Sequence, residues 1–285
     1  MKSVRICVAA ITAGVVCIAV MLGILSAAIY AENESGNSFI GLMYHQVLKD
    51  ESRAGKYIIT PNELESDLAY LSENGYVSVL PSQLVKIREQ GGRLPEKTVV
   101  ITFDDGYETG LYYVLPLLKK YGMKAVINVV GSYTDEYSRI NEEEKHLSYA
   151  YLTWNEIKKL SDSGYVEIGN HTYDMHSYNG ERNGCARKEN ESDEQYRTVL
   201  YENVTRLSDK LQQVTGKRPV AFAYPFGSLS EGSAEIIGSA GISVFMTCCE
   251  QPCSMNRNGR IVINRYNRES GRSAQQICEE FNNAF

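Results

Sequence analysis

The chain has 285 residues, of which 43% are hydrophobic, and its formal net charge is -6. This acidic balance argues against a nucleic-acid partner, which would need a basic face, and only 7 Pro and 23 Gly argue against disorder. After an apolar N-terminal segment, about 250 residues remain, which is enough for one large α/β domain or two small ones.

An uncharged apolar stretch near the N-terminus runs from Ile6 to Ala31, with Lys2 and Arg5 before it and acidic residues after it. It is long enough to cross a bilayer as a helix, and the charge order predicts an exported remainder. A cleaved signal peptide is the alternative. The stretch is long for one, so we predict that residues 1–31 are an uncleaved single-pass anchor in the cell membrane. The folded part is extracellular in either case, and it is secreted if the segment is cleaved.

The rest of the chain divides into a short polar linker, residues 32–38, and one domain, residues 39–285, in which strands alternate with helices. The predicted strands are apolar runs at residues 39–44, 76–80, 98–103, 125–130, 165–169, 220–224, 242–247 and 260–264. Helix starts are predicted at Thr60, Thr153 and Ser192, each followed three residues later by Glu or Gln. This alternation predicts a mostly parallel sheet or an α/β barrel.

Polar side chains follow five of the predicted strands. They are His45, the pair Asp104 and Asp105, His171, the turn Tyr224–Gly227, and Arg265. The C-terminal ends of parallel strands share one rim of an α/β barrel, and active sites lie on that rim. We therefore expect these residues to converge.

A pair of histidines, His171 and His176, lies five residues apart in a polar loop directly after a strand. Two His and one carboxylate leave open positions on a metal, which is typical of a catalytic site. Such a metal acidifies water and polarises a carbonyl, while the second carboxylate of the Asp104–Asp105 pair can act as a general base. The alternative is that the Asp pair forms an ordinary turn and the His pair lies on the surface.

Three motifs resemble, in order and approximate spacing, those of the NodB-like polysaccharide deacetylases. They are Thr102-Phe103-Asp104-Asp105-Gly106, Asn170-His171-Thr172-Tyr173-Asp174-Met175-His176 and Phe222-Ala223-Tyr224-Pro225-Phe226-Gly227. The resemblance covers most of residues 39–281. It implies a distorted (β/α) barrel that hydrolyses N-acetyl, or less often O-acetyl, groups on glycans.

The resemblance also implies roles for the first two motifs. Asp105, His171 and His176 would bind a divalent metal, usually zinc, with cobalt, nickel or manganese as alternatives. Asp104 would be the base.

The third motif implies the side of the site that meets the substrate. A backbone N–H near Tyr224 would help to hold the oxyanion, and Tyr224 and Phe226 would line the sugar groove together with Pro225. Arg265, at the end of a later strand, is expected at the same place.

The chain departs from the common family pattern in three places. Its two histidines are five residues apart rather than four, which resembles the branch that acts on β-1,6-linked poly-N-acetylglucosamine. Ala223 stands where many members have an Arg that pairs with the base, and Arg265 is the candidate replacement. A closing Leu-x-His motif, which usually supplies the general acid, is absent. His45 is the candidate acid, and a structural His bonded to a backbone carbonyl is the alternative.

These observations predict a metal-dependent N-deacetylase that is anchored in the membrane. Its substrate would be a glycan of the cell envelope, either peptidoglycan or poly-N-acetylglucosamine. Two alternatives remain open. The absent closing His is compatible with a catalytically silent glycan-binding relative, and the membrane anchor is compatible with a deformylase of an amino-sugar lipid.

Overall fold

The computed structural model describes residues 38–140, 146–178, 182–255 and 259–283. The predicted membrane anchor, residues 1–31, lies outside these ranges. Within them, no helix has the length and apolar character needed to cross a membrane.

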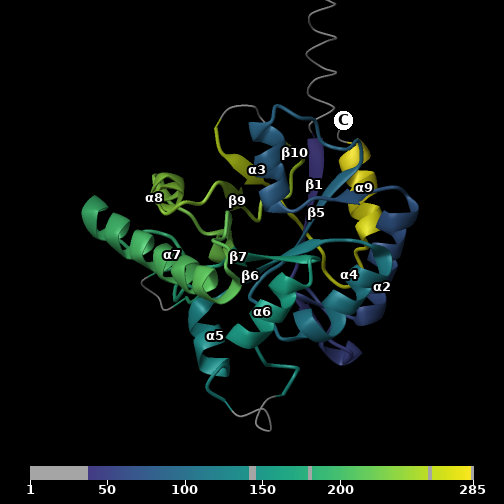
Figure 1. The fold of residues 1–285 in the computed structure, drawn as a ribbon, viewed down its shortest axis with the longest axis horizontal. Coiled ribbons are helices and arrows are strands. Elements are labelled where there is room, and N and C mark those ends of the chain that lie inside the picture. The colour runs from purple at the N-terminus through teal and green to yellow at the C-terminus, as the bar shows by residue number, and fades with distance from the viewer. Residues whose placement is uncertain (1–37, 141–145, 179–181, 256–258, 284–285) are drawn as a thin grey trace, which may run out of the picture.

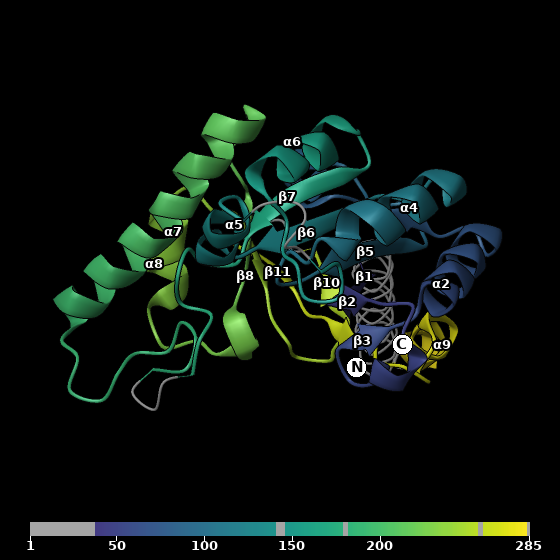
Figure 2. The ribbon, with the colours of Figure 1, turned by 90° about the horizontal axis from the view of Figure 1, so that it is seen from below.

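A ten-stranded sheet forms the centre of the molecule and curls into a nearly closed barrel (Figures 1 and 2). Its strands are β1 (Ser38–Tyr44), β4 (Val77–Ser78), β5 (Thr98–Phe103), β6 (Ala125–Val129), β7 (Val166–Asn170), β8 (Ala221–Ala223), β9 (Val244–Met246), β10 (Cys253–Ser254), β11 (Ile261–Ile263) and β12 (Tyr266–Asn267). The hydrogen-bonded order is β10-β1-β5-β6-β7-β8-β9-β11, and every pairing in this sheet is parallel except that of β1 with β10. The barrel predicted from the sequence is thereby confirmed.

The segment that contains β11 and β12 closes the ring. β11 pairs with β9, and β12, which follows directly in the chain, pairs in parallel with β1. The two chains come so close at this seam that a Cβ on Gly41 would lie 2.3 Å from the carbonyl oxygen of Asn264. Position 41 in β1 therefore requires glycine.

Helices surround the barrel. They are α2 (Pro61–Glu73), α3 (Pro81–Glu89), α4 (Leu115–Tyr121), α5 (Gly131–Tyr137), α6 (Trp154–Asp162), α7 (Asp193–Thr215), α8 (Ser233–Ser239) and α9 (Ala274–Asn283). α2 packs beside α9 at one end of the molecule, and α7 packs beside α8 at the other (Figures 1 and 2). The predicted helix starts at Thr60, Thr153 and Ser192 are confirmed, because each side chain accepts a hydrogen bond from the third residue of its helix.

A single-turn element of a different kind precedes α4, since residues Gly110–Val114 form a π-helix. A small separate sheet, β2 (Gln46–Val47) and β3 (Ile58–Ile59), lies in the connection that follows β1. The sequence pattern did not predict either element. Both are too short to have a periodicity of their own.

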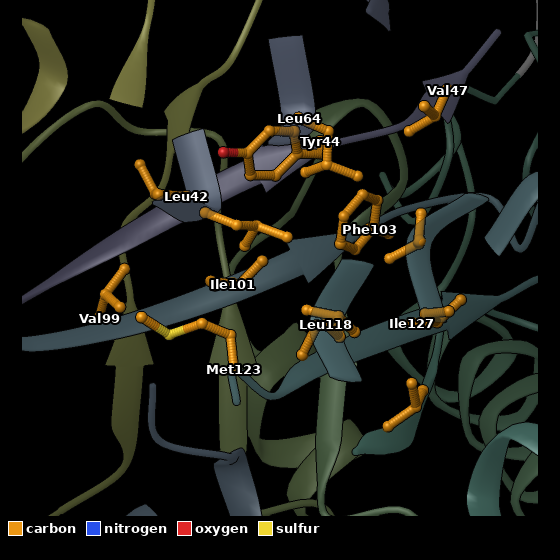
Figure 3. Packing of buried hydrophobic residues seen from close by; sticks show 14 of the residues in the cluster. Leu42, Tyr44, Val47, Leu64, Val99, Ile101, Phe103, Leu118, Met123 and Ile127 are labelled. Carbon is orange, nitrogen blue, oxygen red and sulfur yellow. The ribbon is translucent and has the colours of Figure 1, made fainter. Parts of the chain in front are cut away.

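Successive side chains along a strand point to opposite faces of the sheet, so the strands contribute to two cores, one against the helices and one inside the barrel. Leu42, Ile101 and Ile127 pack with the helix residues Leu64 and Leu118 on the outer face of the sheet (Figure 3). The other alternate positions face the barrel interior, where an apolar cluster joins residues of β5, β6, β8, β9 and β11. The same alternation places the polar residues Thr102 and Asn128 inside the barrel, just below the rim.

Candidate active site

A strained turn at the end of β5 directs the side chains of the adjacent residues Asp104 and Asp105 to different partners. Asp105 and Gly106 both have left-handed backbone conformations, with φ angles of 72° and 73°. Asp tolerates this conformation better than most residues, and at Gly106 a Cβ would lie 3.0 Å from a methyl carbon of Val129. As a result, the neighbouring carboxylates have different partners: Asp104 meets an arginine and Asp105 meets two histidines.

Asp104 lies in the barrel interior and pairs with Arg265, and the Arg265 side chain is completely buried. Asp104 Oδ1 accepts hydrogen bonds from Arg265 Nη1 and Asn128 Nδ2, each at 2.8 Å. Arg265 is itself held by Thr102 Oγ1 at 3.0 Å and by the carbonyl oxygen of Thr247 at 2.9 Å. Burial alone would raise the pKa of Asp104, but Arg265 and His171 outweigh it and lower the pKa to about 2. The carboxylate is therefore ionised at neutral pH.

Asp105, His171 and His176 form a cluster on the same rim. The Oδ1 atom of Asp105 lies 3.4 Å from His171 Nε2 and 3.0 Å from His176 Nε2. One ligand atom from each of the three residues falls within 4.8 Å of the others. The structure thus brings together the three residues for which the sequence predicted metal binding.

The donor atoms of this cluster fit a divalent cation. Asp105 Oδ1 is buried and has no hydrogen-bond partner among the described residues. His171 Nδ1 lies 2.8 Å from the carbonyl oxygen of Ala223, so Nδ1 is the donor and the lone pair of a neutral ring is on Nε2. Lone pairs and a carboxylate that face one point repel each other unless a cation lies between them. Two imidazoles and one carboxylate are a set that zinc and related metals accept.

His45 follows β1 and lies in the same site. It is partly buried, it interacts electrostatically with Asp105 and Asp104, and its ring contacts Tyr57 edge-on with ring centroids 4.7 Å apart. Burial lowers the pKa of His45, and the two aspartates act in the opposite direction. Its Nδ1 has no hydrogen-bond partner among the described residues, so the alternative of a His bonded through Nδ1 to a backbone carbonyl is not what the structure shows.

The turn after β8 corrects part of the prediction for the substrate side. Tyr224 does not line a groove, because only 3% of it is exposed and its ring packs between Phe222 and Phe245. Its N–H donates to the carbonyl oxygen of Met246, so this N–H is not available to an oxyanion. Pro225 is also buried.

Arg265, which was also expected on the substrate side, is fully buried and does not reach it. Its pairing with Asp104 instead confirms the other expectation, that Arg265 replaces the arginine missing at Ala223. Phe226 is the one member of this predicted set that is exposed, at 52%. Its backbone is left-handed, with φ of 58°, and its ring centroid lies 4.6 Å from that of His176. A ring in this position can contact a bound sugar.

Sequence reasoning missed two residues of the site. Asn128, in β6, donates to Asp104, and Tyr133, in α5, donates to the carbonyl oxygen of His176 at 2.9 Å. A signal for Asn128 was present, because it is the only polar residue in the apolar run 125–130. No comparable signal marks Tyr133.

A family model described as polysaccharide deacetylase matches residues 91–245, a range that includes Asp104, Asp105, His171 and His176. The chain belongs to the polysaccharide deacetylase family. It is thus a member of a family of hydrolases, and the residues of the cluster lie within the part that defines the family.

Among curated relatives of this chain is the poly-β-1,6-N-acetyl-D-glucosamine N-deacetylase of Escherichia coli strain K12, 26% identical over 230 residues. That match covers 74% of this chain but only 34% of the E. coli protein, so the chain spans about a third of the relative's length. The enzyme of the same name from Staphylococcus aureus strain MRSA252 is 22% identical over 234 residues, which cover 78% of this chain and 76% of that protein.

Solved structures show the same fold. A de-N-acetylase from Aggregatibacter actinomycetemcomitans aligns with a TM-score of 0.71 and 26% identity, over 85% of this chain and 99% of that one. IcaB from Ammonifex degensii aligns with a TM-score of 0.68 and 25% identity, over 86% and 97%. The similarity therefore extends over most of the described residues.

Proposed function

We propose that this member of the family is a metal-dependent enzyme that hydrolyses N-acetyl groups on N-acetylhexosamine units of a cell-envelope polysaccharide. One observation carries the proposal. The cluster of Asp105, His171 and His176 lies on the same barrel rim as a buried, ionised carboxylate, Asp104, that an arginine holds in place.

The cluster is the binding site that we assign to a divalent metal, with zinc as the first candidate. When bound there, the metal supplies a Lewis acid that polarises the amide carbonyl and lowers the pKa of the attacking water, which suits a base as weak as Asp104. Asp104 then accepts the proton of that water, while Arg265 and Asn128 keep its carboxylate oriented.

We assign the proton donor to His45. An amide is cleaved only if its nitrogen leaves as an amine, so a group on the rim must supply a proton. The imidazole of His45 lies within electrostatic reach of both aspartates, which favour its protonated form, while desolvation is the larger effect and lowers its pKa. The described residues contain two other histidines close to Asp104 and Asp105, and both are already assigned to the metal.

The substrate that we favour is poly-β-1,6-N-acetylglucosamine, with peptidoglycan as the alternative. Two independent facts support the choice: the five-residue spacing between His171 and His176, and the names of the relatives from E. coli and S. aureus. Residues 1–31 would anchor the enzyme in the cell membrane with residues 39–285, the catalytic domain, on the outer side, where such a polymer is found.

The test is acetate release by the purified full-length chain loaded with zinc or cobalt. Poly-β-1,6-N-acetylglucosamine, peptidoglycan and an N-formylated amino sugar would be compared, with and without a chelator. Chelator-sensitive acetate release, highest with the first polymer, is the expected result. Formate release alone would instead identify a deformylase, and bound zinc without release of either acid would favour the silent relative.

Asp105→Ala is the matching variant, and it should lose both zinc and activity because it removes a ligand. Asp162→Asn is its control, since Asp162 forms an exposed ion pair with Lys158 on α6 and should retain both properties. An Asp105→Ala protein with full zinc binding would contradict the assignment of the ligands.

A further inference from the structure

The loop between the two histidine ligands, residues 171–176, docks on the start of α5. The N–H of Gly131 donates to the carbonyl oxygen of Thr172 at 3.1 Å, and the N–H of Ser132 donates to that of Tyr173 at 2.7 Å. A Cβ on Gly131 would lie 2.4 Å from the Tyr173 ring, so the helix start and the loop are in direct contact. The loop backbone therefore follows the position of α5.

Helix α7 holds the same loop from the other side. Asn203 Oδ1 accepts the N–H of Tyr173 at 2.7 Å and that of Asp174 at 3.2 Å. The guanidinium of Arg206 lies 3.5 Å from the centre of the Tyr173 ring and donates to its hydroxyl at 2.8 Å. Figures 1 and 2 show α5 next to α7. The hydrogen bonds to Gly131, Ser132 and Asn203 hold the loop against both helices.

Asp135, on α5, connects these elements. Its Oδ2 accepts the hydroxyl proton of Tyr173, and its Oδ1 accepts from Trp154 Nε1, at the start of α6, at 2.9 Å and from Lys210 Nζ, on α7, at 2.6 Å. One carboxylate thus joins three helices to the ligand loop. Asp135 contacts neither histidine through a hydrogen bond, and its hydrogen bond to the ligand loop is the one to the Tyr173 hydroxyl.

The two ligands do not depend equally on this arrangement. His171 is also fixed by the barrel, because its N–H donates to Val129 and its Nδ1 to Ala223. Among the described residues, the hydrogen bonds, ring contacts and ion pair of His176, at the far end of the loop, are with Tyr133, Phe226, His171 and Asp105. Its position is therefore set mainly by how the loop is held.

We propose that Asp135 is a positioning residue for the metal site, which acts through the hydroxyl of Tyr173 to hold His176 within reach of the metal. This inference rests on the proposed metal site, and it extends that site to a residue on a helix outside the barrel. Residues that orient metal ligands typically change metal affinity by about 10–100-fold when they are altered.

The charge of Asp135 suits this role. Burial would raise the pKa of Asp135, but the hydrogen bonds from Lys210, Tyr173 and Trp154 outweigh it and lower the pKa to about 2. The carboxylate is therefore an anion over the whole neutral range. An Asn at this position keeps the shape, loses the charge and provides only one acceptor atom.

The experiment compares zinc and cobalt dissociation constants of the full-length chain with those of Asp135→Asn, Tyr173→Phe and the double variant. Competition with a chromophoric chelator gives the constants, and the cobalt absorption spectrum reports the ligand geometry. We expect each single variant to bind about 10-fold more weakly and to show an altered spectrum. The double variant should be no worse than the weaker single one, because both changes break the same hydrogen bond.

Asp209→Asn is the matched control. Asp209 lies on α7, as Lys210 does, but it forms a half-exposed ion pair with Arg218, and its loss should leave metal affinity unchanged. Tyr173→Phe keeps the test valid if Asp135→Asn does not fold. Unchanged dissociation constants in a folded Tyr173→Phe protein would overturn this inference but leave the proposed metal site intact. An unaltered chain that binds neither metal would overturn the metal site and the inference with it.

Discussion

The arginines of two buried aspartate–arginine pairs lie on either side of β12, and we assign the two pairs different functions. Arg265 precedes the strand and pairs with Asp104 at 2.8 Å, whereas Arg268 follows it and pairs with Asp67 at 2.7 Å. All four side chains are at least 96% buried. Residue type and burial therefore do not distinguish the pair in the active site from the pair outside it.

The distribution of hydrogen bonds distinguishes them. Asp67 uses both oxygens, because Oδ2 accepts from Arg268 and Tyr44 while Oδ1 accepts the N–H of Ala274. Both hydrogen bonds that the described residues make to Asp104 end on Oδ1. Asp67 is therefore saturated and serves to dock α2 against α9, whereas Asp104 keeps one oxygen for a proton.

The surrounding charges also differ. Burial raises the pKa of Asp67, and Arg268 offsets this only in part. For Asp104 the opposing effect of Arg265 and His171 is larger than that of burial, and the pKa falls. The balance between burial and all the surrounding groups, rather than the presence of an arginine, therefore decides whether a buried carboxylate stays ionised.

Of the substitutions that test the difference between the two pairs, Asp104→Asn should have the largest effect, which is on turnover. The amide accepts no proton, so kcat for acetate release should fall by about 10²–10⁴-fold. Zinc affinity should stay unchanged, because Asp104 is not assigned as a ligand, and chelator competition checks this. Activity close to that of the unaltered chain would remove Asp104 as the base.

Asp67→Asn is the counterpart outside the site. It removes the hydrogen-bonded carboxylate partner of the buried Arg268 and leaves only Glu63, whose Oε1 lies 3.7 Å from Arg268 Nη1. The loss should lower the free energy of unfolding by about 3 kcal/mol. Urea denaturation measures this loss, and kcat of the folded fraction should be unchanged. If kcat fell while stability was retained, the division between a structural and a catalytic pair would be wrong.

His45→Gln tests the residue that we assign as proton donor, beside Asp104 as the base. Glutamine has a similar size but cannot protonate a leaving amine, so kcat should fall by about 10²-fold. An O-acetyl substrate should lose less, since an alcohol leaves more readily than an amine. Equal turnover of the variant and the unaltered chain on the amide would return His45 to a purely structural role.

Gly169→Ala should have the smallest effect of the four. A Cβ at position 169 would lie 2.0 Å from Asn128 Oδ1 and would push Asn128 away from Asp104. Such overpacking costs about 1–3 kcal/mol of stability, and kcat should decrease with it. Gly55→Ala is the control, because nothing lies within 4 Å of its added Cβ. Unaltered turnover in Gly169→Ala would mean that Asn128 does not help to orient the base.

Much of the fold could be predicted from the sequence because buried parallel strands are continuous apolar runs, such as Thr98–Phe103, and capping residues mark the helix starts. The rim residues could also be predicted, since each follows a strand. The direction of the Tyr224 side chain could not, because the strand before it is only three residues long in the structure and its packing depends on α7 and α8. The pair formed by Asp67 and Arg268 has no local signal, since 201 residues separate its members.

The seam of the barrel has a consequence for the order in which the site is assembled. Asp104 pairs with Arg265, which lies 161 residues further along the chain. Arg265 belongs to the segment that closes the barrel. During synthesis, a nascent chain that ends before β11 already contains Asp105, His171 and His176 but has neither Arg265 nor Arg268. Contacts of such long range form slowly. The three residues assigned to the metal are thus synthesised early, and the arginine that orients Asp104 is synthesised only with the segment that closes the ring.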